Sequence, residues 1–247
     1  FYVSFFPQLV AGPIVRAAKF IPQLYEPYNL TKKQFGIALF WIMNGLLKKV
    51  ILADYIALNL VDRVFENPEL FTGVENLMAL YGYSLQVYAD FSGYTDIAIG
   101  IAMLLGFQLP KNFDSPYKAD SCGNFWKRWH ISLSSWLKDY LYIPMGGNRG
   151  GSTFTFVSLA FVALFLFFIS GSFYVLIYFL SGLLLALIIG LIFPKIRGWY
   201  ITNINIMITM LLGGLWHGAS WNFVFWGGLN GLGIVVYKLW RKISPWE

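Results

Sequence analysis

The longest charge-free stretch of the sequence constrains the fold more than any other feature. The 40 residues from Phe154 to Phe193 contain no acidic or basic side chain. A helix needs about 20 apolar residues to cross a hydrocarbon core of about 30 Å, so the stretch is long enough for two spans. Ser170, Gly171 and Ser172 lie near its middle and predict a turn between them. The apolar residues do not alternate with polar ones as in membrane β-barrels, so the predicted spans are helices.

The overall composition agrees with a chain that lies in a lipid bilayer. Hydrophobic residues make up 57% of the sequence and charged residues 12%, whereas an ordinary soluble domain carries about 25% charged residues. The net charge is +6, but the basic residues occur between apolar segments, as in Lys32–Lys33 and Lys48–Lys49. Such flanking charges are typical of contacts with lipid headgroups. We therefore expect no nucleic-acid partner.

The pattern along the chain predicts an all-α, polytopic membrane bundle with re-entrant or amphipathic helices, forming one domain over residues 1–247. The predicted segments, in chain order, are short or re-entrant pieces in the proline-rich residues 1–30, one or two helices in 35–61, a polar loop in 62–73, two apolar halves in 74–109 on either side of 88–96, a loop in 110–122, an amphipathic helix in 123–143, the two spans in 154–193, a basic connector from Pro194 to Trp199, and helices in 200–217 and 219–240. The chain begins at Phe1 and ends at Glu247. We expect it to be an internal fragment of a longer protein.

His217 is one of only two histidines, and it lies in a run without charged residues from Gly198 to Tyr237. An ionisable group in such a run is often functional. Gly213, Gly214 and Gly218 surround it, so the backbone could break here or approach another helix closely, and small neighbours could leave room for a substrate. The alternative is an imidazole that forms a hydrogen bond across a packed bundle.

His130, the second histidine, lies in the amphipathic segment. If the segment is a continuous helix, Trp126, His130 and Ser134 share one face, and Lys127 and Arg128 lie on the opposite face. This pattern predicts a helix at the membrane surface. The imidazole either faces a cavity or forms a hydrogen bond to a carbonyl group and packs between tryptophans.

Other polar groups give weaker signals. Asp90 and Asp96 are expected to form hydrogen bonds or ion pairs within the bundle, with a polar cavity wall as the alternative. The glycine-rich stretch from Gly146 to Gly151 contains Arg149 but lacks the spacing of a phosphate-binding loop. No cluster of Cys and His with zinc-ligand spacing occurs, so no metal is expected.

Five motifs occur together and in order. They are Pro7-Gln8-Leu9-Val10-Ala11-Gly12-Pro13-Ile14, Asp90-Phe91-Ser92-Gly93-Tyr94-Thr95-Asp96, Phe125-Trp126-Lys127-Arg128-Trp129-His130-Ile131-Ser132, Tyr142-Ile143-Pro144-Met145-Gly146-Gly147-Asn148-Arg149 and Gly214-Leu215-Trp216-His217-Gly218-Ala219. In these motifs the chain resembles the membrane-bound O-acyltransferase family, in the branch of the bacterial alginate O-acetyltransferases. The D-alanyl transfer proteins of teichoic acids are more distant relatives.

The resemblance implies a ring of membrane helices around a thin centre, in which His217 is the catalytic histidine and His130 occupies a second functional position. It also implies transfer of acetyl groups from a cytoplasmic thioester, such as acetyl-CoA, across the bacterial inner membrane. Periplasmic acetyltransferase partners would then modify an exopolysaccharide. No cofactor is expected to stay bound. Lys127, Arg128 and Arg149 either attract the phosphates of the donor or face lipid headgroups.

The chain departs from the family pattern between Gly151 and His217, where it is longer than expected. Residues 154–193 therefore predict a two-helix insertion. Three alternative functions remain open at this point: D-alanyl transfer to teichoic acid, a proton-coupled transporter that uses Asp90, Asp96 and both histidines, and a non-catalytic scaffold for polysaccharide export.

Overall fold

The computed structural model describes residues 1–149 and 151–244, with the backbone alone for Pro194 and Lys195. Every regular element in these residues is a helix, and no strand occurs among them, which confirms the predicted all-α class. The chain separates into two compact units. Unit 1 comprises Phe1–Pro116 and Lys127–Leu133, and unit 2 comprises Tyr117–Trp126 and Ser134–Glu247. The single domain over residues 1–247 stays a prediction.

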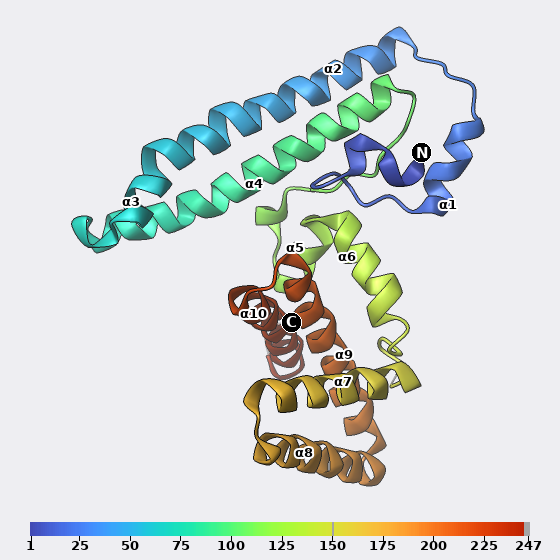
Figure 1. The fold of residues 1–247 in the computed structure, drawn as a ribbon, viewed down its shortest axis with the longest axis vertical. Helices are drawn as coiled ribbons and strands as arrows, with labels where there is room; N and C mark the ends of the chain where they lie inside the picture. The colour runs from blue at the N-terminus through green and yellow to red at the C-terminus, as the bar shows by residue number, and fades with distance from the viewer. Residues whose placement is uncertain (150, 245–247) are drawn as a thin grey trace. The chain divides into compact units, whose positions relative to one another are not determined.

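The first 30 residues of unit 1 form only short helical pieces (Figure 1). These are 3₁₀ turns at Tyr2–Ser4, Phe6–Gln8 and Ile21–Tyr25, and the four-residue helix α1 at Ala17–Phe20. Proline restricts φ and lacks an N–H donor, so it disfavours a long helix here. An aromatic cluster holds the segment together, because the rings of Phe5, Phe20 and Phe107 lie 4.8 to 5.0 Å apart. The predicted short pieces are confirmed.

Two long antiparallel helical segments dominate the rest of unit 1 (Figure 1). The first begins with α2 (Lys32–Leu46) and continues through π-helical turns at Leu47–Asp54 and Ala57–Val61 into α3 (Asp62–Glu66). The second is α4 (Gly73–Leu104), which is 32 residues long. The polar loop predicted for residues 62–73 therefore begins too early, because the helix extends to Glu66. Residues 88–96, predicted to separate two apolar halves, lie inside one uninterrupted helix.

Ion pairs explain why α4 continues through its acidic residues. Lys48 Nζ lies 2.6 Å from Asp96 Oδ2, and Asn44 Nδ2 donates to the same oxygen at 2.8 Å. Lys49 Nζ lies 2.5 Å from Asp90 Oδ1. A carboxylate in an apolar environment is tolerated when it is paired and hydrogen-bonded. The acidic residues therefore have the expected structural role, joining the two long segments.

The two segments approach closely at glycines. A Cβ atom on Gly93 would lie 2.7 Å from the carbonyl oxygen of Gly45, and one on Gly100 would lie 2.7 Å from that of Ala38. Real Cβ atoms do not approach other atoms so closely. Glycine is therefore required at both positions for the backbones to lie side by side.

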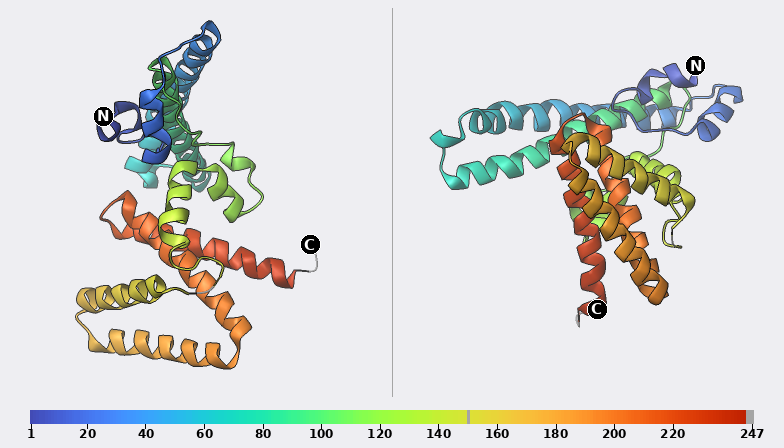
Figure 2. Two further views of the ribbon diagram at one scale, coloured as in Figure 1. Left: turned by 90° about the vertical axis from the view of Figure 1, so that its right-hand side faces the viewer. Right: turned by 60° about the horizontal axis from the view of Figure 1, so that its bottom comes forward.

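Unit 2 contains the hairpin predicted from the charge-free stretch (Figure 1, Figure 2). Helix α7 (Thr153–Ser170) and helix α8 (Phe173–Ile192) are joined at Gly171, whose φ of +59° is a left-handed conformation that glycine adopts easily. Helix α9 (Pro194–His217) follows, so the predicted connector from Pro194 to Trp199 is wrong. Proline fits the first turn of a helix because that turn lacks acceptors for its N–H groups. Helix α10 (Trp221–Ile243) is the last element described.

Four helical segments are long and apolar enough to cross a membrane: Lys32–Glu66, Thr153–Ser170, Phe173–Ile192 and Trp221–Ile243. Their large apolar side chains are widely exposed, including Phe168 at 77% and Leu191 at 74%. In water such surfaces would associate, whereas lipid tails solvate them. The chain is therefore a helical membrane protein.

Candidate functional site

His130 lies at a break between two short helices of the segment predicted to be continuous. Helix α5 spans Cys122–Arg128 and helix α6 spans Ile131–Leu137. His130 has φ of +44°, a left-handed conformation that is strained for a residue with a Cβ atom. The predicted shared face of Trp126, His130 and Ser134 is therefore wrong, because residues 129 and 130 interrupt the helical spacing.

The His130 side chain is buried in unit 1, with 3% of its surface exposed. Its Nδ1 atom lies 3.1 Å from Oδ1 of Asn112. The ring of Phe91 on α4 meets the imidazole edge to face, with centroids 4.7 Å apart and planes at 87°. Asn112 and Phe91 thus both restrict the orientation of the imidazole.

Asn112 is a functional candidate that the sequence analysis missed, since it lies in the predicted loop 110–122. Its side chain is 1% exposed. Besides its contact with His130, Oδ1 accepts hydrogen bonds from the backbone N–H of Ser132 at 3.1 Å and from the Ser132 hydroxyl at 2.8 Å. The Asn112 carbonyl group also accepts from the N–H of Ile131 at 2.9 Å. This loop residue therefore organises the turn on which His130 lies.

His217 is the last residue of α9 in unit 2, and its exposed side chain lies beside three aromatic rings. The imidazole centroid lies 4.9 Å from that of Trp216 and 5.2 Å from that of Trp226, with planes at 82° and 87°. Phe223 lies 6.2 Å away and nearly parallel. Trp226 in turn meets Trp126 edge to face at 5.5 Å. The uncharged segment that contains His217 thus lies among aromatic side chains.

The glycines around His217 mainly allow close packing. A Cβ atom on Gly214 would collide with the carbonyl oxygen of Phe223, and a Cβ on Gly218 would lie 2.6 Å from the Phe223 ring. The predicted close approach of helices is confirmed. Next to Gly218, however, the Phe223 ring occupies the space that was expected for a substrate.

The predicted phosphate-binding cations lie in both units. Arg128 in unit 1 donates to the carbonyl oxygen of Asp114 at 3.1 Å, and its guanidinium lies 3.9 Å from the Asp114 carboxylate. A hydrogen bond from Lys111 lowers the pKa of Asp114, so this carboxylate stays charged and partly neutralises Arg128. Lys127 in unit 1 and Arg149 in unit 2 are exposed.

The loop that carries Arg149 is attached to unit 2 by buried polar contacts. Asn205 of α9 donates to the carbonyl oxygen of Met145 at 2.9 Å, and Thr155 of α7 donates to the same oxygen at 2.5 Å. Asn205 and Thr155 are 0% and 1% exposed. Gly150, part of the glycine-rich stretch, lies outside the described residues. These contacts give the loop a defined position without forming a phosphate-binding turn.

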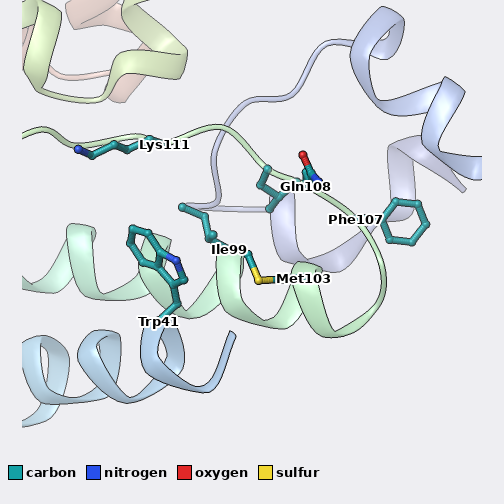
Figure 3. Close-up of a pocket in the computed structure, with 7 residues that line it drawn as sticks. Trp41, Ile99, Met103, Phe107, Gln108 and Lys111 are labelled. Carbon is teal, nitrogen blue, oxygen red and sulfur yellow. The ribbon is translucent and has the colours of Figure 1, made fainter. Parts of the chain in front are cut away.

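A pocket of about 220 Å³ lies in unit 1 and contains neither histidine (Figure 3). It is lined by Trp41, Ile99, Met103, Phe107, Gln108, Leu109 and Lys111. Among residues 1–149 and 151–244, no three His, Cys, Asp or Glu side chains gather as metal ligands would. The histidines and their neighbours are therefore the chemically distinctive groups.

Comparison with known proteins identifies similar sequences over almost the whole chain. The profile of the membrane-bound O-acyltransferase family matches residues 1–206. A peptidoglycan O-acetyltransferase from Helicobacter pylori is 36% identical over 245 residues, which cover 98% of this chain and 37% of that protein. A "probable alginate O-acetylase" from Azotobacter vinelandii is 37% identical over 241 residues, covering 97% of this chain and 38% of the relative.

A teichoic acid D-alanyltransferase from Bacillus subtilis is 26% identical over 257 residues, covering 100% of this chain and 53% of that protein. The chain thus spans less than two fifths of the length of the two O-acetyl-transferring relatives and about half that of the D-alanyltransferase. The family profile ends before His217. The three pairwise alignments cover 97% or more of the chain, so they include His217.

Proposed function

The chain belongs to the membrane-bound O-acyltransferase family, and we propose that it is part of an enzyme that O-acetylates an extracellular polysaccharide. The family match over residues 1–206, together with the O-acetyl-transferring relatives, is the observation that carries the proposal. The acceptors in the names of those relatives are alginate and peptidoglycan, both of which are glycan polymers with hydroxyl groups. We propose an alginate-like exopolysaccharide as the final acceptor, which the acetyl group reaches through periplasmic partners.

His217 is the proposed general base. Its imidazole removes the proton of the acceptor hydroxyl, while the hydroxyl oxygen attacks the carbonyl carbon of the thioester. The tetrahedral intermediate then collapses, the C–S bond breaks, and the thiolate leaves and takes the proton from the imidazolium. A positioned base contributes roughly 10²–10⁴-fold to the rate. The edge contacts with Trp216 and Trp226 support this role because they limit the orientations of the exposed ring.

His130 has the second proposed role, in orienting a substrate or stabilising the developing oxyanion. Its burial, left-handed backbone and hydrogen bond to Asn112 support a fixed geometry. Strain of this kind occurs preferentially at functional sites, where the surrounding structure maintains it.

The donor, partners and location complete the proposal. An acyl thioester such as acetyl-CoA supplies the acetyl group from the cytoplasm, and Lys127, Arg128 and Arg149 attract its phosphates or face lipid headgroups. Periplasmic acetyltransferases receive the acetyl group, and the protein lies in the inner membrane of a bacterium. The interpretation of residues 154–193 as a two-helix insertion stays a prediction.

The three alternatives differ in their support. The D-alanyltransferase relative favours D-alanyl transfer as the second candidate, with the same base and a different acyl group. A proton relay through Asp90 and Asp96 is less favoured, because both carboxylates are held by lysines. A non-catalytic scaffold would tolerate loss of either imidazole.

The test is replacement of His217 in the full-length protein. We expect His217→Gln to reduce acetylation of the exported polymer at least 100-fold while the amount of protein in the membrane stays unchanged, because glutamine keeps the size of the side chain but cannot act as a base. The matched control is Asn222→Gln, which changes a nearby polar residue on α10. Acetylation at the wild-type level in His217→Gln would overturn the role of His217 and favour the scaffold.

A further inference from the structure

We propose that the facing surfaces of α9 and α10 in unit 2 form a binding site for the phosphate group of an anionic phospholipid. Trp199 and Asn203 contribute to the site from α9, and Lys238 and Lys242 contribute from α10. None of these residues takes part in the proposed acyl transfer, so lipid binding can be tested separately from that reaction.

The four residues meet in two contacts between the helices. Trp199 and Asn203 are four positions apart on α9, so they share one face of that helix. The same spacing places Lys238 and Lys242 on one face of α10. Lys238 Nζ donates to Asn203 Oδ1 at 3.4 Å, and Lys242 Nζ lies 5.8 Å from the centre of the Trp199 ring. The two faces are therefore opposite one another.

Two N–H donors at this contact are buried without an acceptor. The indole Nε1 of Trp199 and the amide Nδ2 of Asn203 have no hydrogen-bond partner among residues 1–149 and 151–244. Asn203 is only 6% exposed. Its amide cannot be reversed, because Oδ1 accepts from Lys238, which can only donate. Buried polar groups normally have a partner, so the two donors indicate an acceptor that lies outside the described residues.

The positive charge at the contact also lacks a partner. Within the part of the chain that the structure describes, neither Lys238 nor Lys242 forms an ion pair with a carboxylate. Like charges four positions apart on a helix repel one another. Each ammonium group carries three hydrogens, of which Lys238 uses one on Asn203. An anion would relieve the repulsion and accept from the remaining donors.

The location on α10 indicates which anion binds. This helix is long and apolar enough to cross a membrane, and both lysines lie near its end. Trp240 and Ile243, close to them in the sequence, are 57% and 74% exposed. Lysine and tryptophan at the end of a spanning helix typically lie at the depth of the lipid headgroups. Phosphate groups are concentrated there, and basic pockets between membrane helices bind the headgroups of anionic lipids.

The chemistry of a lipid phosphodiester matches the donors. Its two unesterified oxygens share one negative charge, and each can accept more than one hydrogen bond. Trp199 Nε1 and Asn203 Nδ2 donate to these oxygens, and the two ammonium groups supply the opposite charge. Lys242 is exposed and its side chain is flexible, so it can move from the Trp199 ring and admit the headgroup.

The first experiment measures lipid binding by native mass spectrometry of the full-length protein, which is freed of lipid in detergent and titrated with phosphatidylglycerol. Trp199→Phe keeps an aromatic ring beside Lys242 and removes the N–H donor. We expect the affinity for the first bound lipid to fall roughly tenfold, as for the loss of a hydrogen bond to a charged group. Trp240→Phe changes an exposed ring of α10 and should leave the affinity unchanged. Equal affinities of the wild type and Trp199→Phe would overturn the proposal.

A second pair of variants tests the charge. Lys238→Gln combined with Lys242→Gln should weaken binding about 25-fold, because each lysine close to a lipid phosphate contributes about fivefold. Lys32→Gln combined with Lys33→Gln makes the same change in net charge at the exposed start of α2. Equal losses in the two double variants would show general attraction to an anionic surface, and would overturn the proposal.

Coenzyme A distinguishes the two sources of phosphate, since the thioester donor of the proposed reaction carries phosphates as well. We expect saturating coenzyme A to leave the binding of phosphatidylglycerol unchanged. Displacement of the lipid would assign the site to the donor and overturn the assignment to a lipid.

A measurement on the wild type keeps the proposal testable even if no variant folds. In a maltoside detergent, which contains no phosphate, the ¹⁵N–¹H signal of the Trp199 indole should shift as phosphatidylglycerol is added. If every indole signal stays unchanged, the proposal is wrong. None of these measurements requires acyl transfer, so a failure of the proposed function would not alter their outcome.

Discussion

At the scale of single residues, the left-handed backbone of His130 has a measurable consequence. Alanine at φ of +44° retains the strain, whereas glycine does not, and both remove the imidazole. We expect His130→Gly to be more stable than His130→Ala by about 1–2 kcal/mol, which is the difference that a left-handed conformation imposes on a residue with a Cβ atom. Thermal unfolding in detergent, calibrated with denaturant, measures the difference.

The matched controls are Ser135→Ala and Ser135→Gly in α6. Ser135 lies inside the helix, where glycine is about 1 kcal/mol less favourable than alanine, so here the alanine variant should be the more stable of the two. Equal stability of the two His130 variants would show that the backbone relaxes when the imidazole is removed.

The two histidines were identifiable from the sequence, but the geometry around them was not. His217 was prominent because of its uncharged, glycine-rich surroundings, and in the structure it is exposed beside the rings of Trp216 and Trp226. Asn112 gave no signal, because its role depends on Ser132, 20 residues away, and on Ile14 through Ser132. Contacts between residues far apart in the chain leave no periodic pattern.

At the scale of elements, the contact between the two long segments of unit 1 depends on glycine. We expect Gly93→Ala to destabilise the protein by about 1–3 kcal/mol, because its Cβ would lie 2.7 Å from the Gly45 carbonyl oxygen and force the backbones apart. Gly36→Ala on α2 is the matched control, since nothing lies within 4 Å of its added Cβ. It should stabilise the helix by up to about 1 kcal/mol. Melting temperatures that change in the same direction would contradict this account.

The elements predicted best were those with strong local signals. The hairpin turn at Gly171 was predicted because a polar, glycine-containing turn interrupts an apolar run. The break at Trp129 and His130 was missed because neither residue usually ends a helix, and Asn112 from another segment stabilises the turn. The expected ion pairs of Asp90 and Asp96 were found, but their partners Lys49 and Lys48 could not be assigned from the sequence, because they lie on another helical segment.

At the scale of the whole molecule, the α7–α8 hairpin should cross the bilayer twice. Single cysteines at Ser170 and Phe193, both exposed, test this in the full-length protein with Cys122 and any other cysteines replaced. We expect a membrane-impermeant thiol reagent to label Ser170→Cys from one side of the membrane and Phe193→Cys from the other. Labelling of both from the same side would show that the hairpin does not span.

The membrane class followed from composition, and the family followed from five ordered motifs. Division into two compact units was not predicted, because hydropathy along a chain does not show which helices cluster. Hydropathy predicts each membrane-spanning helix separately. The helices against which it packs are determined by glycine contacts and ion pairs between residues far apart in the sequence.

The continuous helix from Lys32 to Glu66 also has a consequence for the surrounding bilayer. At about 1.5 Å per residue, its 35 residues extend roughly 50 Å, well beyond a hydrocarbon thickness of about 30 Å. Tilt alone would have to exceed the 0–40° seen for membrane helices. If the helix spans, part of it must extend into the headgroup layer, where Lys32 and Glu66 at its two ends can remain hydrated.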